Sequence, residues 1–112
     1  MMYPLCQQTV TVYRREENGI CRQVFENCFY HFTDVRKDNG GDVRYEREFL
    51  LIVPGETQWV FPGDRVLEGV GPEIGPEDWT AFLPVNVYGL SQARYAKVFR
   101  LDGEICHTEA GR

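Results

Sequence analysis

The chain has 112 residues, 43% of them hydrophobic and 26% charged, which is the composition of one ordinary globular domain spanning residues 1–112. Its net charge of −5 at pH 7 argues against a surface that neutralises nucleic-acid phosphates, because that affinity comes from Lys and Arg. No apolar run approaches the roughly 18 residues of a membrane span, so we expect no membrane partner.

The N-terminal residues and the cysteines indicate a cytoplasmic setting. Residues 1–7 lack the charged start and apolar centre of a signal peptide, and we expect them to be flexible. The four cysteines, Cys6, Cys21, Cys28 and Cys106, have irregular spacings and form no Cys-x-x-Cys pair. We therefore expect reduced thiols, as in a cytosolic chain.

The first third of the chain predicts a β-hairpin. Residues 8–14 place Val10 and Val12 in alternation with other side chains, which is the period-two pattern of a half-buried strand. Residues 16–19, Glu-Glu-Asn-Gly, then suit a hairpin turn. Residues 20–33 form the returning strand, and apolar side chains occupy both of its faces over residues 28–32. A strand that changes character midway predicts a bend or a bulge.

Residues 34–42 are the most polar window, and we interpret them as a loop. Its tip contains Asp38, Asn39, Gly40 and Gly41, which we take as a candidate interface. Residues 43–53 then form the clearest strand of the chain. One of its faces is apolar throughout, and the other changes from polar to apolar, which predicts a strand that runs into a region covered on both sides. The shared apolar face carries Val43, Tyr45, Phe49, Leu51 and Val53.

Two proline-glycine turns and a long loop follow. The apolar strand ends at Pro54-Gly55, and Pro62-Gly63-Asp64 begins the next strand, since Pro presets φ and Gly accepts positive φ. Residues 69–80 are rich in Gly, Pro and acids and predict a long loop, with a short helical turn opened by Pro76. Long loops in compact domains are usually either functional or mobile, and we favour the functional interpretation and take this loop as a second candidate interface. Its candidate residues are Glu73, Ile74, Glu77, Asp78 and Trp79.

The C-terminal third predicts a second hairpin. Residues 93–101 alternate as a strand, Asp102-Gly103 is a strong two-residue turn signal, and residues 104–108 form the returning strand. Turn signals recur about every ten residues along the chain. This spacing predicts an all-β fold, a small six- to seven-stranded antiparallel barrel or sandwich with one long loop and one short helical turn.

Three chemical alternatives are open to the same residues. A zinc site or a thiol–imidazole dyad could be formed by Cys28, His31, Cys106 and His107, judged by residue type alone. Residues three apart in a strand, however, face opposite ways. No strand-to-helix elbow is present to activate a thiol. The carboxylates of the long loop read as solvated rather than catalytic, and Gly69-x-Gly71 lacks the strand–turn–helix setting of a dinucleotide site. We expect no catalytic residue, cofactor or metal.

Residues 94–100, Arg-Tyr-Ala-Lys-Val-Phe-Arg, support an alternative function. Basic side chains and aromatic rings on one strand are typical of oligonucleotide-binding barrels, in which the bases of a single strand stack on the aromatic rings. Strict alternation places Arg94 and Arg100 on one face and Lys97 on the other, which dilutes a basic stripe. We therefore favour a sheet strand with a polar outer side and keep nucleic-acid binding as the alternative.

Two motifs resemble a known family. The first motif is Gly-Asp-hydrophobic-hydrophobic-x-Gly, matched after Pro62 by Gly63, Asp64, Val66, Leu67 and Gly69, although Arg65 replaces the usual apolar residue. The C-terminal Gly103, His107, Glu109 and Gly111 match Gly-x-x-x-His-x-Glu-x-Gly. Together, over about residues 9–112, they resemble the minor capsid or head–tail joining proteins, the head-completion connectors, of tailed bacteriophages and prophages.

The resemblance implies a structural protein rather than an enzyme. Such proteins are β-barrels with a long loop that dock as a ring on portal, adaptor or tail proteins of the same phage. It further implies self-association in that ring, and a location in the virion after assembly in the host cytoplasm. The acidic net charge agrees with a DNA conduit, because like charges repel, and we expect no specific nucleic-acid partner.

Overall fold

The computed structural model describes residues 7–112, with the side chains of residues 7–33, 40–41 and 48–112. Within that range seven strands form one antiparallel sheet with the order β5-β4-β1-β2-β3-β7-β6. Their bounds are β1 Gln8–Glu16, β2 Gly19–Asn39, β3 Asp42–Pro54, β4 Arg65–Glu68, β5 Leu90–Gln92, β6 Tyr95–Leu101 and β7 Glu104–Gly111, with a 3-10 turn η1 at Pro76–Asp78. The predicted all-β fold is confirmed. The expected flexible terminus lies almost wholly outside the described residues.

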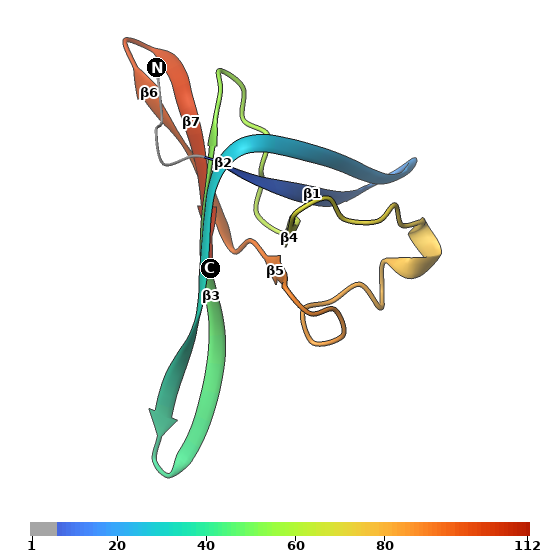
Figure 1. The fold of residues 1–112 in the computed structure, drawn as a ribbon, viewed down its shortest axis with the longest axis vertical. Helices are drawn as coiled ribbons and strands as arrows, with labels where there is room; N and C mark the ends of the chain where they lie inside the picture. The colour runs from blue at the N-terminus through green and yellow to red at the C-terminus, as the bar shows by residue number, and fades with distance from the viewer. Residues whose placement is uncertain (1–6) are drawn as a thin grey trace.

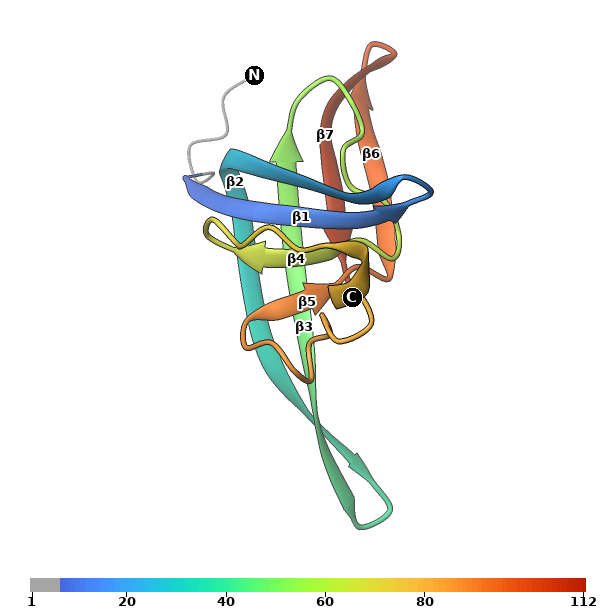
Figure 2. The same ribbon diagram turned by 90° about the vertical axis from the view of Figure 1, so that its right-hand side faces the viewer.

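The sheet curls until its two halves face each other. β1, β4 and β5 form one layer, and β3, β7 and β6 run across them in the other (Figure 2). β2 belongs to both layers, because residues 19–28 pair with β1 and residues 29–39 pair with β3. It bends at Asn27, whose φ is 58°, next to a register shift against β1. The predicted bend is confirmed, and the bulge lets Phe25 and Cys28 both face the core.

The main core lies between the two layers. Its buried residues are Val10, Val12, Cys28, Tyr30, Phe49, Leu51, Val53, Val60, Val66, Ala93 and Ala110. The Tyr30 hydroxyl and the Ser91 hydroxyl share a buried hydrogen bond of 3.1 Å that joins β2 to β5 across the core. The three residues that the apolar face of β3 contributes, Phe49, Leu51 and Val53, are those predicted from its alternation. The side chains of Val43 and Tyr45 lie outside the described residues.

The predicted strand 93–101 is present as β6 but begins two residues later, at Tyr95. The chain leaves β5 at Gln92 and begins β6 at Tyr95, so residues 93 and 94 carry it from one layer to the other. Ala93 donates its N–H to the Asp64 carbonyl (2.8 Å) and accepts from Gly63 N–H (2.7 Å). Arg94 donates to the Gly111 carbonyl (2.8 Å). These bonds turn the chain at a place where alternation alone predicts continuity.

The predicted polar loop 34–42 is wrong. β2 continues to Asn39, which pairs with Asp42, so the turn contains only Gly40 and Gly41. Their φ values of 57° and 105° are the positive values that such a tight turn needs. The resulting β2–β3 ribbon extends past the rest of the molecule (Figures 1 and 2). A two-stranded ribbon outside the core can be polar throughout, which explains why composition misled the prediction.

The long loop covers the outer face of the β1–β4–β5 layer. Tyr13, Phe82 and Leu90 form a second buried cluster, with Ile74 and Trp79 packed against it. The connection runs from Gly69 to Gly89, longer than the predicted 69–80, and the helical turn expected at Pro76 is present as η1. This layer is therefore covered on both faces, by the main core on one side and by the loop on the other.

We predict that Gly111→Ala destabilises the fold. A Cβ built on Gly111 would lie 2.7 Å from the Phe49 carbonyl oxygen, a backbone atom, and 2.7 Å from the Tyr95 hydroxyl. Overpacking of this kind costs about 1–3 kcal/mol in the free energy of unfolding. Urea unfolding monitored by tryptophan fluorescence measures the loss, and Arg112→Ala at the exposed neighbouring position is the control. Equal stability of both variants would show that β7 moves to admit the methyl group.

Candidate docking surfaces

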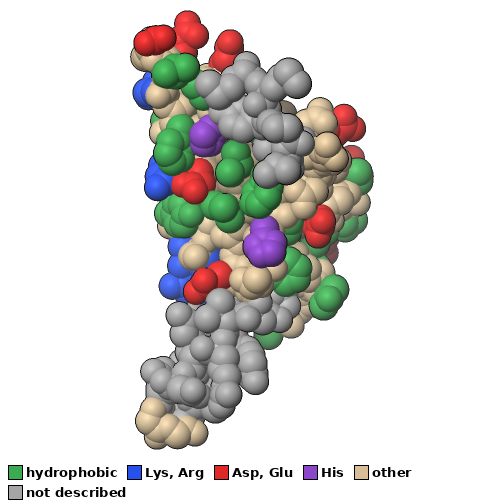
Figure 3. Space-filling model, turned by 60° about the vertical axis from the view of Figure 1, so that its left-hand side comes forward, with side chains coloured by type: hydrophobic (Ala, Val, Ile, Leu, Met, Phe, Trp, Pro, Cys, Tyr) green, Lys and Arg blue, Asp and Glu red, His purple; other side chains and the backbone are tan. Residues whose placement is uncertain are grey.

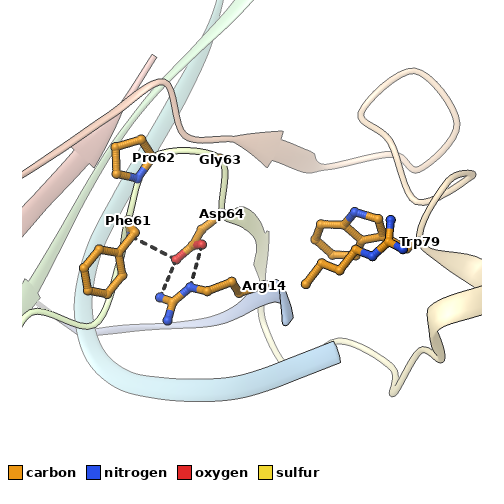
Figure 4. A pocket seen from close by; sticks show the side chains of 7 residues that line it. Arg14, Phe61, Pro62, Gly63, Asp64 and Trp79 are labelled. Atoms are coloured by element: carbon orange, nitrogen blue, oxygen red, sulfur yellow. Dashed lines mark hydrogen bonds and ion pairs between the residues drawn. The ribbon is translucent and has the colours of Figure 1, made fainter. Parts of the chain in front are cut away.

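Asp64 anchors the Pro62-Gly63-Asp64 turn to β1. Its side chain is 2% exposed and accepts bonds from Arg14 Nε (2.9 Å) and Arg14 Nη2 (2.8 Å) (Figure 4). The Phe61 N–H donates a third bond to it at 2.9 Å. Arg14 also donates to the Trp59 carbonyl at 2.8 Å and lies over the Phe61 ring, 4.4 Å from its centroid. The carboxylate raises the pKa of the Arg14 guanidinium above its usual value.

An open hollow of about 450 Å³ adjoins this anchor, lined by Arg14, Arg15, Phe61, Pro62, Gly63, Asp64 and Trp79. The acid among these residues is already held by Arg14, and no thiol, hydroxyl or imidazole belongs to the lining. The hollow therefore offers aromatic and cationic contact area, but it brings together no nucleophile and base.

Arg65 fixes the far part of the long loop. Its side chain is 7% exposed and donates to the carbonyls of Trp79 (2.6 Å) and Phe82 (2.7 Å). The guanidinium also lies 3.7 Å from the centroid of the Trp79 ring. Burial lowers the pKa of Arg65. In the sequence, Arg65 stands out only because it occupies a position that is usually apolar. That departure was the one sequence signal of a buried arginine that holds the loop.

The start of the loop is fixed by side chains of β1 and β2. The Thr11 hydroxyl donates to the Gly69 carbonyl and accepts from Gly71 N–H, each at 2.8 Å. The Tyr13 hydroxyl donates to the Pro72 carbonyl at 2.6 Å, and Arg22 donates to the Gly71 carbonyl. Burial raises the pKa of Tyr13, an effect partly opposed by the nearby Arg22. The loop is thus anchored at both ends while its middle faces outward.

The predicted loop residues fall into two groups. Ile74 and Trp79 are half-buried and pack on the second cluster, so they support the loop. Glu73, Glu77 and Asp78 are exposed. Three apolar side chains that the sequence analysis did not select are also exposed on this connection, namely Val70 at 73%, Val85 at 86% and Tyr88 at 89%. Exposed apolar residues cannot be told from core residues by sequence in a segment without periodicity.

The C-terminal motif lies on the β6–β7 hairpin. Asp102 and Gly103 form its turn with φ values of 53° and 83°, as the Asp-Gly pair predicts. His107 stacks on Phe99 with ring centroids 4.6 Å apart, and Glu109 pairs with Lys97 at 3.3 Å. The motif residues therefore connect β7 to the neighbouring strands β6 and β3; they are Gly103, His107, Glu109 and Gly111. At the other candidate loop, Gly40 and Gly41 are exposed at the hairpin tip, whereas the side chains of Asp38 and Asn39 lie outside the described residues.

The outer face of the β3–β7–β6 layer carries both apolar and charged side chains (Figure 3). Alternation places Leu50, Ile52, Lys97, Phe99 and Glu109 opposite the core on this face. β6 is the last strand of the sheet, and among the described residues its backbone pairs only with β7. Lys and Arg side chains lie along the left border of the molecule in Figure 3.

The residues considered for zinc do not converge. Cys28 is buried in the core whereas His31 is exposed, because they point to opposite faces of β2. Cys21, Cys28 and Cys106 are thiols, and Cys6 lies outside the described residues. Among the residues that the structure describes, no group of three or more His, Cys, Asp or Glu side chains is placed to hold a metal ion.

Comparison with known proteins identifies no relative. No family model matches the chain, no curated protein matches it, and no solved structure matches its fold. In the described part of the chain, no helix has the length and apolar character needed to cross a membrane.

We predict that Asp64→Asn lowers the free energy of unfolding by about 1.5–3 kcal/mol, the usual range for hydrogen bonds to charged groups. The amide keeps the shape of the carboxyl but presents an NH₂ to a guanidinium whose ion pair at 2.8 Å is with Asp64, while Glu16 attracts it more weakly. The Arg14 side chain is 32% exposed, so solvent screens part of the loss. Chemical denaturation measures it, with Glu68→Gln on the exposed end of β4 as control. A loss below about 0.5 kcal/mol, the usual range for surface substitutions, would contradict the anchoring role.

We predict that Tyr13→Phe changes both stability and its pH dependence. Loss of the bond to the Pro72 carbonyl lowers the free energy of unfolding by about 0.5–1.5 kcal/mol at pH 8. The folded-state pKa of Tyr13 is raised above 10.0, so its contribution is complete below pH 10 and is lost as pH rises through the folded-state value. Denaturant titrations from pH 8 to 11 should show a shallower decline for the variant. An identical slope would refute the role of burial.

Proposed function

We propose that this protein is a non-enzymatic structural protein of a tailed phage or prophage virion, where it joins head to tail. In this role it docks as a ring on a portal-side partner and acts as a connector, adaptor or stopper. The proposal includes the partners implied by the sequence, namely portal, adaptor or tail proteins of the same phage. It also includes assembly in the host cytoplasm and a final place in the virion.

The observation that carries the proposal is what the motif residues do. Asp64 anchors a corner, Gly69 and Gly103 take positive φ in turns, and Gly111 leaves room for a carbonyl oxygen. These roles shape the backbone, and Asp64, the motif acid that lines the hollow, is already paired with Arg14. A motif of this kind supports a protein that presents surfaces to partners.

The arrangement of the projecting segments supports the same proposal. The β2–β3 ribbon and the connection with η1 both extend from the two-layered body, in different directions (Figure 1). The η1 connection is anchored by Arg65 and Tyr13, so its exposed residues are presented on a fixed frame. Pre-organised surfaces bind with a smaller loss of conformational entropy, which suits assembly.

The test is binding to the neighbouring components of the same phage. We expect the chain to co-migrate with its portal ring, alone or with an adaptor, in size-exclusion chromatography. The double variant Val70→Ser/Val85→Ser removes exposed apolar contacts and leaves the anchors intact, so it should weaken binding without a change in unfolding midpoint. The matched control is Thr57→Ser, an exposed position on the connection between β3 and β4.

A genetic experiment decides the role in the virion. Removing the gene from the phage or prophage should yield separate heads and tails in electron micrographs, and the wild-type chain should restore joined particles. Infectious virions formed without the protein would refute the proposal. So would the failure of the chain to co-migrate with every head and tail component of that phage.

A further inference from the structure

Two surfaces of the chain have opposite charge and comparable apolar content. The first is the β6 surface, residues 94–101 at the edge of the sheet, which carries Lys97 on one face, Arg94 and Arg100 on the other, and no acid within the segment. The second is the η1 surface, residues 69–89, which carries Glu73, Glu77 and Asp78 and neither Lys nor Arg. All six charged residues are exposed. The two segments therefore carry +3 and −3 in a molecule whose net charge is −5, and Glu109 of β7 pairs with Lys97 beside the first segment.

The exposed apolar side chains gather on the same two surfaces. Eight large hydrophobic residues are exposed in the described part of the chain, and six of them are shared equally between these surfaces. The β6 surface presents Tyr95, Phe99 and Leu101, and the η1 surface presents Val70, Val85 and Tyr88. Exposed apolar residues bordered by charges are typical of protein–protein contacts, where the apolar part supplies affinity and the charges set the partner.

Their positions exclude contact within one molecule. β6 and η1 lie on opposite sides of the fold (Figure 1), with the two layers of the sheet between them. Both surfaces are also held in place, β6 by its pairing with β7 and the η1 surface by Arg65 and Tyr13. A contact between these two different surfaces of neighbouring copies is head-to-tail. Repetition of one head-to-tail contact closes a ring when the rotation between successive copies divides a full turn.

We propose that the β6 surface of one copy binds the η1 surface of the next copy, and that this contact builds the ring. The inference rests on the proposed function for its biological setting but is defined for the isolated chain. Lys97 is 60% exposed although it pairs with Glu109, so its ammonium group can still reach an acid of the neighbouring copy. The occupant of each surface is thus a second copy of this chain.

Zero-length cross-linking tests the contact directly in the wild-type protein. A carbodiimide joins a carboxylate to an amine by an amide bond with loss of water, and the chain has only two lysines, Lys37 and Lys97. In an equal mixture of ¹⁴N- and ¹⁵N-labelled chains at about 1 mM, a concentration that populates weak contacts, we expect mixed-isotope peptides that link Lys97 to Glu73 or Glu77. The absence of such peptides at this concentration would overturn the proposal.

Charge-reversal variants test the same contact through the association constant of the chain. One double variant, Arg94→Glu/Arg100→Glu, reverses charges on the β6 surface, and the other, Glu73→Lys/Glu77→Lys, reverses them on the η1 surface. Each should lower the association constant measured by sedimentation velocity about tenfold or more. A 1:1 mixture of the two variants should restore association, because every contact then joins an acidic surface to a basic one. Added salt should weaken the wild-type contact. Unfolding midpoints check that each variant folds, and neutral Gln substitutions at the same positions replace a variant that does not.

The outcomes separate this inference from the proposed function. Unchanged association in both variants, or no rescue in the mixture, would refute the contact even if the chain still co-migrated with a portal ring. Association through the named surfaces without any binding to phage components would keep the contact and refute the connector role. Salt-dependent binding of a fluorescein-labelled single strand, lost in Arg94→Glu/Arg100→Glu and without Lys97 cross-links, would assign β6 to nucleic acid instead.

Discussion

The hydrogen bonds of Asp64 are the contact on which the two-layered fold most depends. Its carboxylate neutralises Arg14 on β1 and caps the turn at Phe61, while its carbonyl accepts from Ala93, where the chain passes from β5 to β6. One residue thus joins β1, in one layer, to the segment that leads into β6, the edge strand of the other layer. A charge this deeply buried is retained only when it is paired and fully hydrogen-bonded, and here both conditions hold.

The neighbouring Arg65 extends this order to the long connection. By donating to the carbonyls of Trp79 and Phe82, it turns a segment without regular secondary structure into a cover for the outer face of β1, β4 and β5. The same bonds leave the other side of the segment outward and in a fixed shape. An assembly surface requires rigid support on one side and exposed acidic and apolar side chains on the other. The hydrogen bonds that stabilise the loop therefore also hold the surface of the proposed contact in place.

The β2 strand explains how one sheet becomes two layers. The bulge at Asn27 shifts the alternation by one residue, so that apolar side chains of odd number before it and of even number after it reach the same core. Sequence alternation predicted a bend or bulge in this strand from its two apolar faces, but it did not locate the bulge at Asn27. The same strand then continues past the core into the β2–β3 ribbon, where polarity gave no sign of strand structure because no core is present to demand apolar residues.

Local sequence determined the strands with a buried face, the tight turn at Asp102-Gly103, the short helical turn η1 opened by Pro76, and the absence of regular periodicity after Gly69. Each of these depends on backbone preferences of adjacent residues. Tertiary structure alone decided that Arg65 and Asp64 are buried, that residues 93–94 change layers, and that the basic β6 surface and the acidic η1 surface face opposite ways. Those features arise from contacts between residues far apart in the chain, and no local pattern encodes which distant partner a side chain will meet.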